Sequence, residues 1–133
     1  DVRYAVNKNS SEWTSRNMGI LGTLILIFLV IHLKGFWYEM HWGGIATANY
    51  EGKEVKDLYA VVEAAYTQPW HVMVYVISML ILAFHLWHGF ASAFQTLGLN
   101  HLKYNPVIKV VGRAFAIIVP ALFALIPIWM FLN

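Results

Sequence analysis

The sequence contains no cysteine and few charged side chains, and each shortage restricts what the chain can do. Without cysteine, its 133 residues hold no disulfide, no cysteine-ligated zinc or iron–sulfur cluster and no thioether-attached haem. Any metal is therefore expected to be bound by histidine. Only 12% of the residues are charged and 59% are hydrophobic, so little of the surface suits water and an ordinary soluble domain is not expected.

Charged residues are missing from three long stretches of 17, 39 and 20 residues: 17–33, 64–102 and 114–133. A hydrocarbon core of about 30 Å is crossed by roughly 20 apolar helical residues. The sequence therefore predicts an all-α integral membrane bundle whose three transmembrane helices lie at about 17–40, 70–97 and 106–132. The net charge of +2 comes without a run of Lys and Arg, which argues against nucleic-acid binding.

Local signals predict the helix ends. The Gly43–Gly44 pair is expected to end the first helix, and Gly98 to stop the second. Asn105 is expected to be the N-cap of the third helix, because a proline follows it. Pro120 and Pro127 lie inside the third helix, where each removes a backbone donor, so they are expected to kink it.

Residues 43–68, between the first two helices, are polar but contain one amphipathic pattern. Its apolar side chains recur at a helical spacing: Val55, Leu58, Tyr59, Val62 and Tyr66. Such a spacing places them on one face of a helix. We expect this helix to lie flat on the bilayer or to cap the bundle, with a solvated loop helix as the alternative.

The distribution of Lys and Arg predicts the orientation of what we take as a single transmembrane domain, 1–133. Six of the nine basic residues lie on the side of the N-terminus and the second loop, and three lie opposite. By the positive-inside tendency, segments 1–16 and 98–105 face the cytoplasm, whereas 43–68 and the C-terminus face outward. Because the chain begins at Asp1 without an initiating Met or a signal pattern, we expect it to be the later part of a longer polypeptide.

Three of the six histidines, His32, His85 and His88, fall inside the predicted membrane spans. The other three, at helix ends or in a loop, are expected to be solvated: His41, His71 and His101. A polar side chain without a partner is costly in a membrane, so an intramembrane histidine is expected to be functional. Haem ligation and a proton relay are both open, beside a histidine bonded to a neighbouring helix.

Helix geometry restricts the haem interpretation. His85 and His88 are three residues apart on one helix face, so they cannot bind opposite sides of one iron. The third predicted helix has no histidine. If His32 and His88 each bind a haem, both irons need second ligands from outside this sequence. At about 1.5 Å per residue, His32 lies roughly 22 Å and His88 roughly 14 Å from the inner helix ends, in different layers.

Small and polar residues accompany these histidines. Gly89 and Ser92 leave room beside His88 for a flat macrocycle or for close helix packing. Ser15, Arg16 and Gln95 lie near inner helix ends, where haem propionates or a quinone head group accept hydrogen bonds. Simple anchoring of the topology is the alternative for the arginine.

Three strings, IHLKGFW, KDLYAVVEAAYTQP and FHLWHGFASAFQTLGLNH, resemble the cytochrome b membrane subunit of succinate:quinone oxidoreductases, the single-anchor, two-haem type. The resemblance covers nearly all of the chain, and the HG pair followed by SAFQTLG is its most specific portion. It implies five transmembrane helices, of which these are the last three. His32 then resembles the ligand of the outer haem b, and His88 that of the haem nearer the cytoplasm, with His85 as the competitor. The first two helices and their ligands lie outside this sequence.

The resemblance also implies partners: a flavoprotein subunit that interconverts succinate and fumarate, an iron–sulfur subunit on the cytoplasmic face, the upstream helices, lipid and membrane quinone. The complex would reside in the inner (cytoplasmic) membrane, and this chain would contain no catalytic residue for the dicarboxylate. One alternative is the cytochrome b of a hydrogenase or formate dehydrogenase. Another is a haem-free transporter or proton channel with a histidine relay, although the charge-free stretches 17–33, 64–102 and 114–133 supply no membrane-embedded Asp or Glu.

Overall fold

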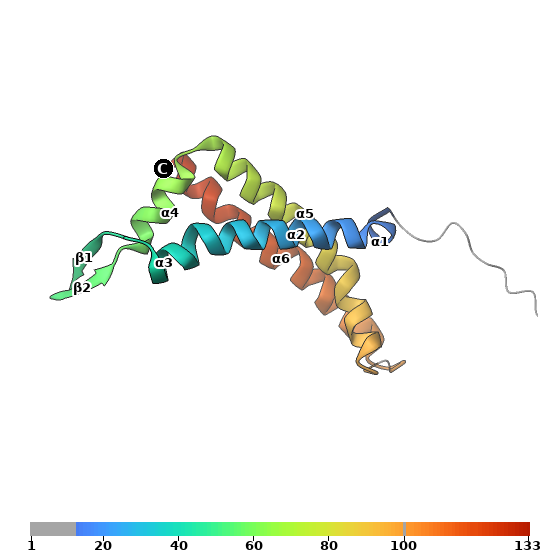
Figure 1. Ribbon diagram of the computed structural model, residues 1–133. Coiled ribbons are helices and arrows are strands. Elements are labelled where there is room, and N and C mark those ends of the chain that lie inside the picture. The colour runs from blue at the N-terminus through green and yellow to red at the C-terminus, as the bar shows by residue number, and fades with distance from the viewer. Residues whose placement is uncertain (1–12, 100) are drawn as a thin grey trace, which may run out of the picture.

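The computed structural model describes residues 13–99 and 101–133 and shows a helical membrane bundle (Figure 1). Within these ranges, three helices are long and apolar enough to cross a membrane: Met18–Trp42, Pro69–Thr96 and Asn105–Leu132. A short helix, α1 (Trp13–Arg16), precedes the first of them. The predicted all-α bundle of three spans is confirmed, and the chain is a multi-pass membrane protein.

The first span consists of three consecutive segments: α2 (Met18–His32), the π-helical η1 (Leu33–Tyr38) and α3 (Glu39–Trp42). It ends where Gly43 turns to an extended conformation, and the amide of Gly43 still donates to the carbonyl of Glu39 at 3.0 Å. The predicted end at Gly43–Gly44 is thus confirmed. The π-helical segment was not predicted, and such wide turns are frequent at functional sites.

A two-stranded antiparallel hairpin follows, formed by β1 (Thr47–Tyr50) and β2 (Lys53–Lys56). Glu51 and Gly52 make its two-residue turn with φ of 50° and 81°, and two positive φ values are typical of the type I′ turn that suits hairpin twist. The Asn49 side chain accepts a bond from the Gly52 amide at 3.0 Å. This hairpin projects beyond the helices at one end of the molecule (Figure 1).

The predicted amphipathic helix is shorter than its pattern suggested. Helix α4 (Leu58–Tyr66) begins after Asp57, whose carboxylate accepts a hydrogen bond from the Ala60 amide at 3.1 Å. The prediction was wrong for Val55, which lies exposed in β2, whereas Tyr59 lies in α4 as predicted and is 68% exposed. The face that packs inward consists of Leu58, Val61, Val62, Ala65 and Tyr66.

Helices α5 (Pro69–Thr96) and α6 (Asn105–Leu132) lie side by side (Figure 1). Gly98 stops α5 as predicted: at φ 73° it donates to the Gln95 carbonyl, while Leu99 donates to the Phe94 carbonyl, which is a Schellman motif. The predicted N-cap of α6 was wrong. Tyr104 is the cap, whereas Asn105 is already helical and its side chain accepts from the His101 amide at 3.1 Å, closing the preceding turn.

The face of α6 that is buried against the bundle carries small side chains and prolines. Its buried residues are Gly112, Ala116, Pro120 and Pro127. A Cβ at Gly112 would overlap the ring of Phe90 on α5, so glycine is what lets these two helices approach. Helix α6 continues through both Pro120 and Pro127.

A hydrophobic cluster made mainly of aromatic residues, called here the aromatic cluster, closes the end of the bundle near α4. Its buried members are Phe36, Tyr66, Val72 and Tyr75, from η1, α4 and α5. The chain's C-terminus, α4 and the start of α5 meet at this end (Figure 1). By contrast, only 11–17% of the most apolar part of each span is buried. Lipid or further protein must therefore cover most of the apolar surface of the three helices.

Candidate functional site

The three intramembrane histidines lie in two different places. His32 belongs to α2 and joins the aromatic cluster near α4, while His85 and His88 belong to α5 and lie closer to the turn that leads into α6. Among residues 13–99 and 101–133, no three His, Asp or Glu side chains gather in a way that would hold a metal ion by themselves. A metal bound by this part of the chain would therefore have few protein ligands from it.

His32 is held by a hydrogen bond and by aromatic packing. Its Nδ1 atom lies 3.3 Å from the Tyr75 hydroxyl, and its ring centroid lies 5.7 Å from that of Phe28 and 5.4 Å from that of Phe36. When Nδ1 carries the proton, it donates to the tyrosine oxygen, and Nε2 keeps the lone pair that a metal requires. An outer partner on the second ring nitrogen is how metal-binding histidines are usually oriented.

A cavity of about 440 Å³ adjoins His32, with walls from α2, η1, α4, α5 and α6. Its lining is mostly apolar, and its polar members are His32, Tyr66 and Tyr75. Burial raises the pKa of Tyr66 to about 12, so that phenol stays protonated and able to donate a hydrogen bond. Such a cavity suits a flat apolar group that has a few hydrogen-bonding atoms.

His71 occupies a position that the sequence did not indicate. We expected a solvated side chain, but its ring stacks on Tyr75 with centroids 4.9 Å apart and also meets the edge of Tyr66 at 5.9 Å. Its buried Nε2 has no hydrogen-bond partner within the described residues. The reason is that α4 folds over the start of α5 and covers a residue that would otherwise face the membrane boundary. His41 and His101 are exposed, as predicted.

His85 and His88, which sequence reasoning did not separate, have different surroundings. The His85 ring packs against α2, where a Cβ at Gly22 would lie 3.5 Å from its Cε1 atom. Its buried Nδ1 lacks a hydrogen-bond partner in the part of the chain that the structure describes. His88 lines two cavities instead, of about 630 Å³ and about 180 Å³, and His85 lines neither.

The larger of these two cavities brings together several of the predicted residues. Gly89 and Ser92 line it with His88, beside Met18 of α2 and Thr96 of α5. A Cβ at Gly89 would meet only the methyl group of Met18, at 3.7 Å, so the cavity wall is open there.

The other predicted residues do not line that cavity. Gln95 is exposed on α5, and Arg16 is exposed on α1. The side chain of Ser15 lies outside the described residues.

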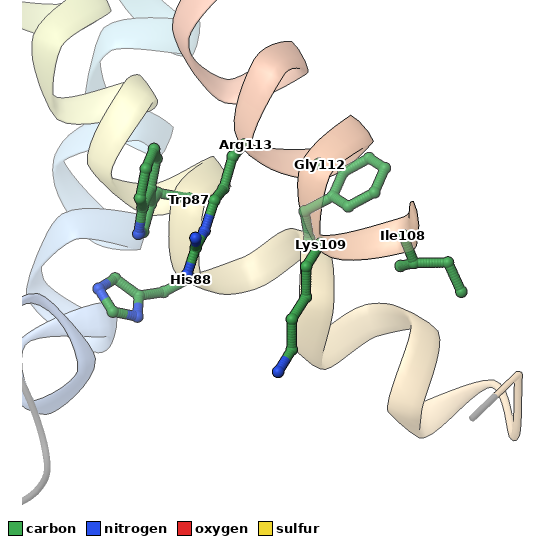
Figure 2. Close-up of a pocket in the computed structure, with 7 residues that line it drawn as sticks. Trp87, His88, Ile108, Lys109, Gly112 and Arg113 are labelled. Atoms are coloured by element: carbon green, nitrogen blue, oxygen red, sulfur yellow. The ribbon is translucent and has the colours of Figure 1, made fainter. Parts of the chain in front are cut away.

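The smaller cavity contains residues that the sequence did not single out. It lies between α5 and α6, and its polar lining includes Lys109 and Arg113 beside His88 (Figure 2). From the sequence, Lys109 and Arg113 were used only as part of the count of basic residues that predicts the orientation. Their four-residue spacing does place them on one helix face, but only the packing of α6 on α5 brings them to Trp87 and His88.

Comparison of the sequence and structure with protein-family models, curated proteins and solved structures found no match.

Proposed function

We propose that this chain is a haem-b-binding membrane anchor that passes electrons between an iron–sulfur subunit and membrane quinone in a succinate dehydrogenase or fumarate reductase. One observation carries the proposal: His32 and His88 come from different helices and line separate cavities, each of which contains a single intramembrane imidazole. One ligand at each of two sites matches what the sequence resemblance implies for two haems.

The surroundings of His32 fit an axial ligand. With the proton on Nδ1 donated to the Tyr75 hydroxyl, Nε2 would be free to hold the iron, and the adjoining cavity is mostly apolar and aromatic. The described part of α2, α5 and α6 contains no Asp or Glu inside the spans that would compete for the imidazole proton. Haem b, when bound, supplies reversible one-electron chemistry at its iron.

The surroundings of His88 fit a second, separate site. Beside His88, α5 contributes the small residues Gly89, Ser92 and Ala93 to the lining of the larger cavity. The Thr96 hydroxyl donates to the Ser92 carbonyl at 3.0 Å, so it is satisfied within the helix and does not compete for a ligand. His85 packs against Gly22 of α2, which favours His88 as the ligand and His85 as a residue of the helix contact.

The remaining parts of the proposal concern what lies around the chain. Upstream helices of the same subunit would supply the second axial histidines. The flavoprotein and iron–sulfur subunits would dock on the cytoplasmic side of the inner membrane, the side on which the positive-inside tendency would put residues 98–105. Succinate and fumarate would react in the flavoprotein, and this chain would hold and space the haems and contribute to a quinone pocket.

A haem-free histidine relay is the second candidate, and one observation favours it. His71 stacks on Tyr75, and the Tyr75 hydroxyl meets His32, so three polar groups follow one another at the α4 end of the bundle. A relay across the whole membrane would also need a polar link from His32 to His85 or His88.

The deciding experiment is a reduced-minus-oxidised absorption spectrum of the intact membrane complex, combined with identification of the subunits that purify with it. The proposal expects b-type haem bands and a flavoprotein partner. A spectrum without haem bands would refute it and support the relay. Haem bands together with a hydrogenase or formate dehydrogenase would keep the haem sites and replace the proposed enzyme.

A further inference from the structure

A cavity of about 180 Å³ lies between α5 and α6, near the end at which α5 stops and α6 begins. Figure 2 shows the Arg113 side chain reaching from α6 toward Trp87 and His88 on α5, while Lys109 extends from the preceding turn of α6. The close contact of Gly112 with Phe90 keeps the two helices together at this level. The cavity is therefore built by the packing of two helices and not by loose surface side chains.

The two cations of this cavity have no carboxylate partner in the described part of the chain. Among the described residues, an ion pair is found between Lys34 and Glu39, which both lie in the first span and not in the cavity. All described Asp and Glu residues lie between positions 39 and 63, before α5 begins. The Arg113 guanidinium instead lies over the Trp87 ring, with its central carbon 5.1 Å from the ring centroid. Two neighbouring cations on a membrane helix favour the binding of an external anion.

The position of the cations indicates which anion is available. At about 1.5 Å per residue, Lys109 lies roughly 6 Å and Arg113 roughly 12 Å along α6 from its start. Their long side chains reach the level of the lipid head groups. On the same helix, Val110 and Val111 are exposed and provide apolar surface for acyl chains.

We propose that Lys109 and Arg113 bind the phosphate of an anionic phospholipid in the cavity between α5 and α6. The planar guanidinium donates two parallel hydrogen bonds to phosphate oxygens, and stacking on Trp87 holds it in place for this. Lys109 adds a second positive charge, and the head group lies in the cavity while its chains follow α6. His88, the proposed haem ligand, also lines this cavity, so the test follows lipid binding and the haem bands separately and the two proposals can fail independently.

The test is native mass spectrometry of the intact purified complex titrated with phosphatidylglycerol or with phosphatidylcholine. The wild type is expected to retain phosphatidylglycerol preferentially. Lys109→Gln and Arg113→Gln should each weaken the first bound phosphatidylglycerol about fivefold, and leave phosphatidylcholine unchanged. Arg113→Lys, which keeps the charge but loses the fork, should fall between the wild type and Arg113→Gln. It also provides a variant that is expected to assemble if Arg113→Gln does not.

Lys103→Gln is the matched control. Lys103 is also a cation beside an aromatic ring, 5.6 Å from the centroid of Tyr104, but it does not line the cavity. An equal loss of lipid in this control would mean general attraction to the basic end of the bundle and would overturn the proposal. Displacement of the lipid by millimolar inorganic phosphate would show a site for soluble phosphate instead. Loss of haem bands with unchanged lipid binding in Arg113→Gln would assign the cavity to a haem carboxylate.

Discussion

The Nδ1 atom of His32 on α2 lies 3.3 Å from the hydroxyl oxygen of Tyr75 on α5. This hydrogen bond joins the first and second spans at the level of the aromatic cluster, and it fixes the rotation of the imidazole. Under the proposed function, Tyr75 is a positioning residue because it contacts the ligand and not the iron. If Tyr75 orients His32, loss of its hydroxyl should change haem binding, which a purely structural role of the tyrosine would not do.

Tyr75→Phe is expected to weaken haem binding at His32 without abolishing it. The ring would still pack against Phe28 and Phe36, but the imidazole would lose the partner that orients it. Loss of such an outer hydrogen bond typically lowers metal affinity about 10–100-fold. Haem titration of the intact complex, together with the potential of the affected haem, measures this. Unchanged affinity and potential would show that Tyr75 only fills space.

His88→Ala is expected to remove one haem while the chain still inserts into the membrane, because His88 lines the open cavity beside Gly89. His85→Ala should keep both haems, since His85 packs against Gly22. The haem-to-protein ratio measured from pyridine haemochrome spectra distinguishes them. His41→Ala is the control, as His41 is exposed and bonded to the Trp37 carbonyl. The reverse pattern would transfer the ligand role to His85.

Gly112→Ala is expected to destabilise the α5–α6 contact by about 1–3 kcal/mol, because the added Cβ would overlap the Phe90 ring. The thermal unfolding temperature of the complex measures the loss. Gly19→Ala is the matched control, since nothing lies within 4 Å of the added Cβ on α2. Combining Gly112→Ala with Phe90→Leu should restore part of the stability. If Gly112→Ala unfolds at the wild-type temperature, the helices tolerate a wider separation than we infer.

The stability of the α4 end is expected to fall as the pH rises above about 10. Burial raises the pKa of Tyr66 from 10.0 to about 12, so the folded protein retains a proton that the unfolded chain releases. The contribution is complete below pH 10 and is lost as the pH rises from about 10 to about 12. The difference in unfolding temperature between the wild type and Tyr66→Phe should shrink over this interval. A constant difference would contradict the assignment.

The sequence predicted the three spans well because a membrane helix is specified by the absence of charge over a sufficient length. Its end signals were also local, as at Gly43 and Gly98, where the chain itself supplies the turn. The hairpin was not predicted, because Val55 continues the helical spacing of the residues after it, and the Glu51–Gly52 turn is the only local signal of two strands. In this segment the Asp57 cap decides where the helix begins.

The surroundings of the candidate sites were less accessible to sequence reasoning. Burial of His71 depends on α4 folding back over α5, and nothing in the residues next to it indicates this. Likewise, Arg113 meets Trp87 where the preceding Gly112 lets α6 approach the Phe90 ring of α5. Both contacts join residues of different helices, and a pattern confined to one helix cannot specify them.

The π-helical segment Leu33–Tyr38 begins at the residue after His32 and separates this histidine from Trp42 of α3. A regular α-helix of the same composition would rotate those residues about the axis relative to the histidine. Removing one residue from this segment should therefore leave the span long enough for the bilayer, yet rotate Trp42 of α3 about the helix axis relative to the imidazole. In this helix, the number of residues is as strict a requirement as their identity.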